Sequence, residues 1–589
     1  MIKTLAKYIG EFKIPSILTP ICMIVEVIME MITPLLMASI VDKGVEAGNI
    51  GHIYKMGLYM VIAAAIGLIG GLVGANLAAK ASAGFARNLR KAMFDNIQTF
   101  SFANIDKFST AGLVTRLTTD VTNIQNAYQM ILRMCMRAPS SLIIALSMTF
   151  FINARIASIY LIAVLFLALV MAIIVMTAMK YFRQVFKKYD ELNESVQENV
   201  TGIRVVKAFV REDYEESRFA RASENIYKMF VKAESAVVIN FPVMNFTVYA
   251  CILVISWIGA HMIVSNTLTT GELMSLLTYC MNILISLAML SMIFVMVTMS
   301  AASAERIAEV INEEATISNP ENPVYEIEDG SIEFKDVYFR YNLTSKEPVL
   351  TDIDLKIESG ETIGILGGTG SAKTSLVNLI SRLYDVNGGE VLVGGKNVKE
   401  YDLETLRNEV SVVLQKNVLF SGTILDNLRW GDENATLEDC KRVCRMASAD
   451  EFIDKMPDGY ETKIEQGGNN VSGGQKQRLC IARALLKKPK ILILDDSTSA
   501  VDTATDAKIR KAFAEEIPNT TKIIIAQRIS SVQNADRIVV MDNGRISGVG
   551  THEELLATNE IYKDVYESQT GGAGDFDSPD GDSSKGGEQ

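Results

Sequence analysis

The first half of the chain carries long apolar stretches that contain no charged residue. They include Met56–Ala79, Ile156–Met179 and Leu273–Ser303, and Ala138–Ala154 and Ser235–Gly271 are also free of Asp, Glu, Lys and Arg. A helix needs about 20 consecutive apolar residues to cross the hydrocarbon core of a bilayer. These stretches therefore predict membrane-spanning helices.

Six membrane spans are expected in this half of the chain. We place them near residues 14–41, 54–79, 136–153, 156–180, 240–264 and 273–300. Glu26 and Glu30 interrupt the first span, which is otherwise apolar. The residues before it form a short, basic, amphipathic segment, more typical of a helix at the membrane surface than of a cleaved secretory signal.

Composition argues against several classes of protein. Hydrophobic residues make up 49% of the 589 residues and the mean hydropathy is +0.20, which argues against general disorder and against a wholly soluble protein. The formal net charge of −12 argues against a large basic surface for nucleic acid. The 7 cysteines include no CxxC pair and there are only 3 histidines, so we expect buried, reduced thiols rather than a zinc site.

Lysine and arginine are distributed unevenly among the loops between the expected spans. They gather before span one and in two long loops, which join spans two and three and spans four and five. The other three loops contain only Lys43 and Arg155. The positive-inside rule then places both termini and both long loops in the cytoplasm. We expect a multi-pass protein of the plasma (inner) membrane.

The two long loops keep the apolar periodicity of helices, for example over Ala81–Phe100 and Asp120–Met134. Spans two to five are therefore expected to continue well beyond the membrane. Each long loop would turn at its tip, near 104–112 and 200–211. These tips are natural contact points for the domain that follows.

From about Glu321 the pattern becomes that of a soluble α/β domain. Ser331–Tyr341 and Val349–Ile357 alternate as strands, and the apolar strand Thr362–Leu366 leads through a glycine-rich loop into a helix, Ser375–Tyr384. This order of strand, loop and helix is the context of a phosphate-binding loop. The loop consists of Gly367, Gly368, Thr369, Gly370, Ser371, Ala372, Lys373 and Thr374.

The types of residue in this loop suit a nucleotide. Backbone N–H groups of the loop and of the helix N-terminus would hold the β-phosphate. Lys373 would reach the β- and γ-phosphate oxygens, and the Thr374 hydroxyl would bind Mg²⁺.

Two further elements complete the phosphate chemistry. Four apolar residues, Ile491–Leu494, predict a buried parallel strand that ends at Asp495, where a carboxylate is placed to hold Mg²⁺. Ser472, Gly473, Gly474 and Gln475 open the helical stretch Lys476–Leu486, and such a helix N-terminus is a second anion site. The two anion sites are too far apart in sequence to share one loop. One of them is therefore expected to serve the nucleotide of a neighbouring chain.

The order of these motifs resembles that of the ATP-binding cassette. The resemblance is carried by GGTGSAKT, Gln415, VSGGQ, ILILDD, Asp502 and Gln527, and VSGGQKQR is a highly specific signature. Six spans and two long cytoplasmic loops ahead of a cassette resemble the half-transporter form of ABC exporters. The expected fold is a membrane α-helical domain of six long helices at 1–315 and a cytosolic α/β P-loop cassette at 316–570. A disordered acidic tail is expected at 571–589.

The resemblance implies a dimer with two ATP molecules between two cassettes. Each ATP would lie between the phosphate loop of one chain and the signature of the other, with Mg²⁺ as the second cofactor. Tyr341 would stack on adenine, and Ser375 would join the phosphate loop in binding the nucleotide. Gln415 would connect the metal and the γ-phosphate to the membrane helices, and Asp502 would touch the partner. The two loop tips would be the coupling helices.

The sequence departs from the family pattern at four positions. The residue after the Walker B aspartate, usually a glutamate that activates water, is Asp496, which is one methylene shorter. The usual switch histidine is Gln527, which can hydrogen-bond a γ-phosphate but cannot relay a proton. A further expected glutamate falls on Gln466, and the last glycine of the phosphate loop is Ala372. We expect helix-like dihedral angles at Ala372, because a Cβ at positive φ costs about 1–2 kcal/mol.

The joint loss of the glutamate and the histidine resembles the degenerate site of a heterodimeric ABC exporter. This chain would then hold ATP and hydrolyse it slowly, while its intact signature completes the active site of a second half-transporter subunit. Three alternatives stay open. They are a homodimeric exporter that tolerates drift, a nucleotide-gated channel or regulator, and an engineered hydrolysis-deficient form.

Two groups of residues in the spans are candidates for substrate binding. Glu26 and Glu30 are one helical turn apart and share a face, so they would attract cationic substrates, unless they face a water-filled cleft or pair locally. Met289, Met292 and Met296 form a stripe on span six that suits promiscuous binding or plain helix packing. The expected substrate is a small amphipathic or drug-like molecule, or a lipid or peptide. Membrane lipid is expected as a further partner of the spans. On span two, close helix contact is expected at Gly67, Gly70, Gly71 and Gly74.

Overall fold

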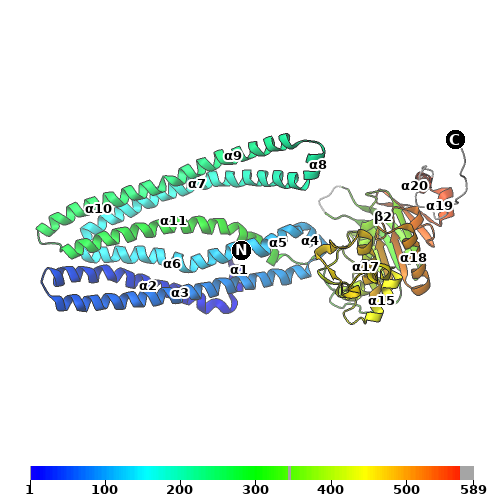
Figure 1. Ribbon diagram of the computed structural model, residues 1–589, viewed down its shortest axis with the longest axis horizontal. Helices are drawn as coiled ribbons and strands as arrows, with labels where there is room; N and C mark the ends of the chain where they lie inside the picture. Colours follow the sequence, from blue (N-terminus) through cyan, green and yellow to red (C-terminus); the bar gives the residue numbers. More distant parts are fainter. Residues whose placement is uncertain (1, 343–346, 571–589) are drawn as a thin grey trace. The chain divides into compact units, whose positions relative to one another are not determined.

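The computed structural model describes residues 2–342 and 347–570, apart from some side chains at residue 2 and within 183–194 and 291–299 (Figure 1). The chain divides into two compact units. The membrane unit comprises Met1–Thr99 and Ser109–Glu313, and the cassette unit comprises Phe100–Phe108 and Glu314–Gln589. The second unit thus includes a short segment from the middle of the first, which a linear division of the sequence does not anticipate. The limits 1–315 and 316–570 themselves stay a prediction.

The membrane unit is built from long helices. They are α2 (Lys13–Ile40), α3 (Ile50–Thr99), α6 (Val121–Ile152), α7 (Ala154–Thr201), α9 (Glu212–Val238), α10 (Asn240–Val264) and α11 (Thr270–Asn312). Among the described residues, six helical segments are long and apolar enough to cross a membrane, which confirms the expected number of spans. The residues ahead of α2 form two short helical pieces, Ile2–Ala6 and Lys7–Phe12.

The helices pair along their lengths, α2 with α3, α6 with α11 and α7 with α9 (Figure 1). Two buried tyrosine hydroxyls of the membrane unit donate hydrogen bonds to backbone carbonyls. Tyr279 Oη donates to the carbonyl of Met31 at 2.6 Å, and Tyr160 Oη donates to that of Leu276 at 2.7 Å. Glycines of α3 allow α2 to approach closely. A Cβ on Gly74 would lie 2.5 Å from the Met23 side chain, so the expected close contact is present.

The cassette unit contains two main sheets. The antiparallel sheet has the order β2-β1-β4-β5 and the larger sheet the order β12-β11-β3-β10-β9-β6. The bounds are β1 (Ile332–Phe339), β2 (Leu350–Ile357), β3 (Thr362–Gly367), β4 (Gly388–Val393), β5 (Lys396–Asn397), β6 (Val410–Val413), β9 (Ile491–Asp495), β10 (Thr521–Ile525), β11 (Arg537–Asp542) and β12 (Arg545–Gly550). A short pair, β7 (Gly422–Thr423) and β8 (Lys463–Ile464), forms a third sheet. Together with the six spans, these sheets confirm the expected fold class.

Helices flank the sheets of the cassette unit. They are α12 (Lys373–Ile380), α13 (Leu403–Glu409), α14 (Ile424–Leu428), α15 (Leu437–Met446), α16 (Asp450–Ile453), α17 (Gly473–Leu486), α18 (Thr503–Glu516), α19 (His552–Thr558) and α20 (Glu560–Thr570). The helix expected at Ser375–Tyr384 is α12, which begins two residues earlier and ends at Ile380. The tail 571–589 lies outside the described residues.

The two expected loop tips are short helices. The first holds α4 (Phe102–Phe108), and the second holds α8 (Ile203–Ala208). The α4 segment contacts the cassette unit through Asp106, which accepts a hydrogen bond from Tyr384 Oη at 2.6 Å. The Phe102 and Tyr384 rings meet edge to face. These contacts account for the grouping of Phe100–Phe108 with the second unit.

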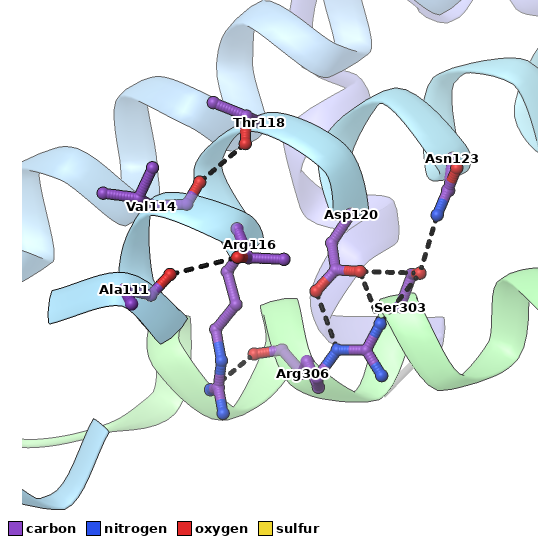
Figure 2. A network of polar contacts seen from close by, with 9 residues as sticks. Ala111, Val114, Arg116, Thr118, Asp120, Asn123, Ser303 and Arg306 are labelled. Carbon is purple, nitrogen blue, oxygen red and sulfur yellow. Dashed lines mark hydrogen bonds and ion pairs between the residues drawn. The ribbon is translucent and has the colours of Figure 1, made fainter. Parts of the chain in front are cut away.

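A buried carboxylate joins the start of α6 to the C-terminal part of α11 (Figure 2). The chain between α5 (Thr110–Thr115) and α6 forms a π-helical turn that ends at Asp120, whose side chain is 1% exposed. Asp120 accepts two hydrogen bonds from Arg306, at 2.8 and 2.5 Å, and a third from Ser303 Oγ at 2.9 Å. The Arg306 side chain is 46% exposed, so only one member of this ion pair is fully withdrawn from water.

This asymmetry predicts unequal effects of removing the two partners. Arg306→Ala leaves the Asp120 charge buried without its cation and should destabilise the membrane unit by about 2–3 kcal/mol. Asp120→Ala leaves an arginine that water can reach and should cost about 1 kcal/mol. Thermal unfolding of the purified protein in detergent measures both.

The control is Lys228→Ala, which removes an exposed pair with Glu224 and should cause no measurable change. A loss for Asp120→Ala as large as that for Arg306→Ala would contradict the interpretation.

Candidate nucleotide-binding site

Three parallel strands end side by side at one edge of the large sheet. In register, Ile525 of β10 lies between Ile365 of β3 and Asp495 of β9. The loops that follow these strands carry the phosphate loop, the residue after Asp495 and Gln527. The sheet therefore brings together three of the sequence motifs, as expected at the carboxyl edge of an α/β sheet.

The phosphate loop turns tightly after β3. A Cβ on Gly367 would lie 2.4 Å from the Met541 carbonyl oxygen, so only glycine fits there. Gly370 has φ +87°, and Ala372 has φ +71° and ψ 23°, both left-handed. The expectation of helix-like angles at Ala372 is therefore wrong. The residues on either side of Ser371 are thus both left-handed. The turn into α12 requires this geometry, despite the energetic cost of the Ala372 Cβ.

Lys373 folds back over the loop. Its Nζ donates to the carbonyls of Gly367 at 2.9 Å and Gly368 at 2.8 Å, and to Ser371 Oγ at 3.2 Å. Burial lowers the pKa of Lys373, and the nearby Asp495 and Asp496 oppose that shift. The ammonium is thus held at the mouth of the loop, where phosphate oxygens would replace the carbonyls.

Thr374 and Asp495 lie where a metal ion would bind. Thr374 Oγ1 donates to Asp495 Oδ2 at 2.9 Å, and burial raises the pKa of Asp495. A hydroxyl and a carboxylate within hydrogen-bond distance suit Mg²⁺, which takes oxygen ligands and keeps few protein ligands beside phosphate and water. Within the described residues, no cluster of three or more His, Cys, Asp or Glu side chains could hold a metal ion alone. These two residues therefore fit an ion shared with ATP.

Asp496, Gln527 and Gln415 also come together. Gln527 Nε2 donates to Asp496 Oδ2 at 3.1 Å, and Gln415 hydrogen-bonds the same carboxylate. Burial raises the pKa of Asp496, and these two hydrogen bonds oppose the shift. Asp496 has φ +47°, which sequence reasoning missed, although aspartate tolerates this conformation better than most residues. The two altered catalytic positions thus contact each other.

Tyr341 stands beside the phosphate loop, as a base-stacking residue would. Its hydroxyl and that of Ser375 are 2.8 Å apart, and 47% of the residue is exposed. Its ring meets Tyr384 edge to face at 5.0 Å. Sequence reasoning assigned no role to Tyr384, whose position just past the end of α12 was the available signal.

The signature opens α17. Ser472 Oγ accepts from Gln475 N at 3.2 Å, and Gln475 Oε1 accepts from Ser472 N at 2.9 Å, which forms a capping box. Gly473 is the first residue of the helix, and a Cβ on Gly474 would lie 2.7 Å from the Ala500 carbonyl oxygen. In the described part of the chain no hydrogen bond joins these four residues to the phosphate loop.

Gln477 is a buried residue of this site that sequence reasoning missed. Its Oε1 accepts from Ala500 N at 2.9 Å and its Nε2 donates to Ser499 Oγ at 3.2 Å. Ser499 Oγ in turn donates to the carbonyl of Asp496 at 3.0 Å. Asp502, a few residues on, caps α18 by accepting from Thr505 N. The start of α17 is therefore tied to the loop between Asp496 and Asp502.

In the membrane unit, Glu26 and Glu30 both contact Arg137 of α6. Arg137 Nη2 donates to Glu30 Oε2 at 2.8 Å, and Nη1 contacts Glu26 Oε1. Local pairing across two helices is therefore present, and one guanidinium is shared by two carboxylates. Both glutamates line a groove of about 550 Å³.

Two methionines of the expected stripe have described side chains, and neither lines this groove. Met289 is 37% exposed and Met296 is half-buried, and neither is among the groove residues. The side chain of Met292 lies outside the described residues.

The left-handed conformation of Ala372 yields a stability prediction. Ala372→Gly removes the Cβ penalty and should stabilise the cassette unit by about 0.5–1 kcal/mol, with ATP affinity unchanged or higher. Denaturant unfolding of the purified protein measures the change. The matched control, Ala507→Gly at an exposed interior position of α18, should destabilise by about 1 kcal/mol. Destabilisation by both substitutions would show that the Cβ of Ala372 does not strain the loop.

Comparisons with known proteins agree with this geometry. Residues 16–288 match the family described as the ABC transporter transmembrane region, and residues 350–499 match the ABC transporter family. The chain is 36% identical over 554 residues to the uncharacterized ABC transporter ATP-binding protein YfiB of Bacillus subtilis (strain 168), covering 94% of this chain and 96% of that protein. It is 33% identical over 488 residues to the ATP-dependent lipid A-core flippase of Desulfotalea psychrophila, covering 82% and 84%.

The fold matches a solved structure described as a bacterial Atm1-family ABC exporter with ATP bound. The TM-score is 0.81 at 21% identity, over 95% of this chain and 99% of the other. The chain therefore belongs to the ABC transporter family, as a multi-pass membrane protein with an ATPase cassette and an exporter fold.

Proposed function

We propose that this chain is one half of a heterodimeric ABC exporter and holds a slowly hydrolysing ATP site. Its signature, Ser472–Gln475, completes the active site formed by the phosphate loop of a second half-transporter subunit. The single observation that carries this proposal is the contact between Asp496 and Gln527.

That contact weakens both residues as catalysts. A general base must come within about 2.6–3.2 Å of the water it activates. Asp496 is shorter than glutamate, sits in a left-handed backbone conformation and already accepts a hydrogen bond from Gln527. Gln527 carries no proton to relay. ATP would therefore be bound at this site by intact phosphate-binding residues and turned over slowly.

The signature, by contrast, keeps every feature needed to bind a phosphate. Ser472 and Gln475 form a capping box, Gly474 has no room for a side chain, and the buried Gln477 holds the start of α17 in place. Because α17 is a 14-residue helix, its N-terminus presents free N–H groups and a positive dipole end to an anion. This supports a role for the signature at an ATP bound by a partner.

The residues of this chain divide the work of binding ATP. Lys373 and the N–H groups of the phosphate loop neutralise β- and γ-phosphate charge, and Tyr341 offers a ring face to adenine. Thr374, Asp495 and Gln415 would hold Mg²⁺, which supplies charge compensation on the phosphates. Closure of two cassettes on ATP would move the coupling helices α4 and α8 and turn the membrane cavity outward.

The proposed cargo is a small amphipathic molecule or a lipid, moved outward across the plasma membrane. A relative named as a lipid flippase and the amphipathic groove at Glu26 support this class. The excess of lysine and arginine in the two long loops supports cytoplasmic termini and a cytoplasmic cassette. A homodimeric exporter is the nearest alternative, and high ATPase activity of this chain purified alone would favour it.

The division of labour predicts different effects of two substitutions in the co-purified pair. Ser472→Arg places a cation and a bulky side chain at the phosphate of the active site and should lower ATPase activity at least about 100-fold, as loss of an oxyanion contact does. Asp496→Asn should lower it less than twofold. Steady-state phosphate release measures both, and equal losses would overturn the heterodimer proposal.

The buried Asp495 predicts how Mg²⁺ binding depends on pH. Mg²⁺ needs the carboxylate, and burial raises the pKa of Asp495 above its usual value of 3.8. Acidification should therefore abolish the Mg²⁺-dependent gain in ATP affinity at a higher pH than for an exposed aspartate. ATP titrations with Mg²⁺ and with EDTA across pH 4–7 measure this gain. In Asp495→Asn the gain should be small at every pH, and a pH-independent gain in the native chain would contradict the assignment.

A further inference from the structure

An amphipathic groove lies among the apolar helices α2, α3 and α6. Its volume is about 550 Å³, and its charged lining consists of Glu26, Glu30, Arg133 and Arg137. Gly71 of α3 makes room for it, because a Cβ there would lie 3.2 Å from the Glu26 carboxylate. Four ionisable side chains from two helices thus share one opening in a membrane span.

The ion pairs in the groove are incomplete. Arg137 serves both glutamates, so two carboxylates share one guanidinium. Arg133, one turn before Arg137 on α6, also lines the groove, and its Nε is buried with no hydrogen-bond partner among the described residues. One unit of negative charge around Glu30 and one unit of positive charge at Arg133 are therefore left for a ligand to match.

The position of the groove suits a ligand with an apolar tail. Glu26 lies 14 residues before the end of α2, which is about 21 Å along a helix and within a hydrocarbon core of about 30 Å. Next to the charges, Leu68 and Leu72 of α3 also line the groove and are 64% and 63% exposed. Charged groups at such depth are costly unless a partner or a polar ligand meets them.

We propose that this groove binds the headgroup of a zwitterionic amphiphile. The acidic group of the ligand meets Arg133, its amine meets Glu30, and its hydrocarbon chain lies along Leu68 and Leu72. A phosphoethanolamine lipid has this chemistry. The inference rests on the proposed exporter function, whose substrate class it names.

Quenching of a tryptophan in the groove by lipid tests the proposal. The full chain carries Leu68→Trp together with Trp257→Phe and Trp430→Phe, and is placed in nanodiscs. Brominated phosphatidylethanolamine, phosphatidylglycerol and diacylglycerol are then titrated as quenchers. Phosphatidylethanolamine should associate about tenfold more tightly than diacylglycerol and several-fold more tightly than phosphatidylglycerol.

Two substitutions separate the two charges. Arg133→Gln should lower the affinity for phosphatidylethanolamine to that for diacylglycerol. Arg133→Lys should still bind the phosphate-containing lipids more tightly than diacylglycerol. Glu30→Gln should lower the affinity for phosphatidylethanolamine to that for phosphatidylglycerol. A tryptophan at Leu161 of α7, which is exposed away from the groove, should show no selectivity between lipids.

Equal quenching by all three lipids, preference for phosphatidylglycerol, or no effect of Arg133→Gln would each overturn the proposal. The quenching requires neither ATP nor a partner subunit. If lipid binding is selective but the ATPase test contradicts the heterodimer proposal, the groove assignment still holds. If the ATPase test succeeds but lipid binding is not selective, only the groove assignment is wrong.

Discussion

A backbone in the hydrocarbon core of a membrane has no water to hydrogen-bond, and a helix satisfies all its amides within one spanning segment. The rest of this structure depends on that constraint. Helices α3, α7 and α11 have 50, 48 and 43 residues, which is about 65–75 Å at 1.5 Å per residue and more than twice the core thickness. The excess length continues beyond the membrane without a break in the hydrogen-bond ladder. The polar contact between Asp120 and Arg306 lies in this continuation of α6 and α11 (Figure 2).

The features that could be predicted from sequence are those with a local signal. Charge-free stretches predict five of the six spans, because desolvation of a charge is penalised wherever the helix contacts lipid, and the first span is apolar apart from Glu26 and Glu30. The strands ending at Gly367 and Asp495 are apolar runs bounded by loop residues, and the loops after them are recognisable by residue type. The grouping of Phe100–Phe108 with the cassette unit has no such signal. It depends on contacts such as Asp106 with Tyr384, across a long sequence separation.

The same distinction holds within the candidate site. The roles of Lys373, Thr374 and Asp495 follow from their residue types and order, and the structure places all three together. The left-handed backbone at Ala372 and Asp496 could not be predicted, because it is imposed by the turns between strand and helix rather than by the residues themselves. Local pairing of Glu26 and Glu30 was left open from the sequence, but their partner was not identified. That partner is Arg137 of another span, more than 100 residues away in the sequence.

The two halves of the proposed division of labour are joined inside one chain. Gln477 links the start of α17 to Ser499 and Ala500, and Ser499 bonds the carbonyl of Asp496. A Cβ on Gly474 would lie 2.7 Å from the Ala500 carbonyl oxygen, so the helix and this loop are in close contact. A shift of the signature on a partner's nucleotide would therefore carry the backbone of Asp496 with it. Under the heterodimer proposal, the side chains at 496 and 527 are free to change, whereas the loop that carries Asp496 must be kept to support the signature.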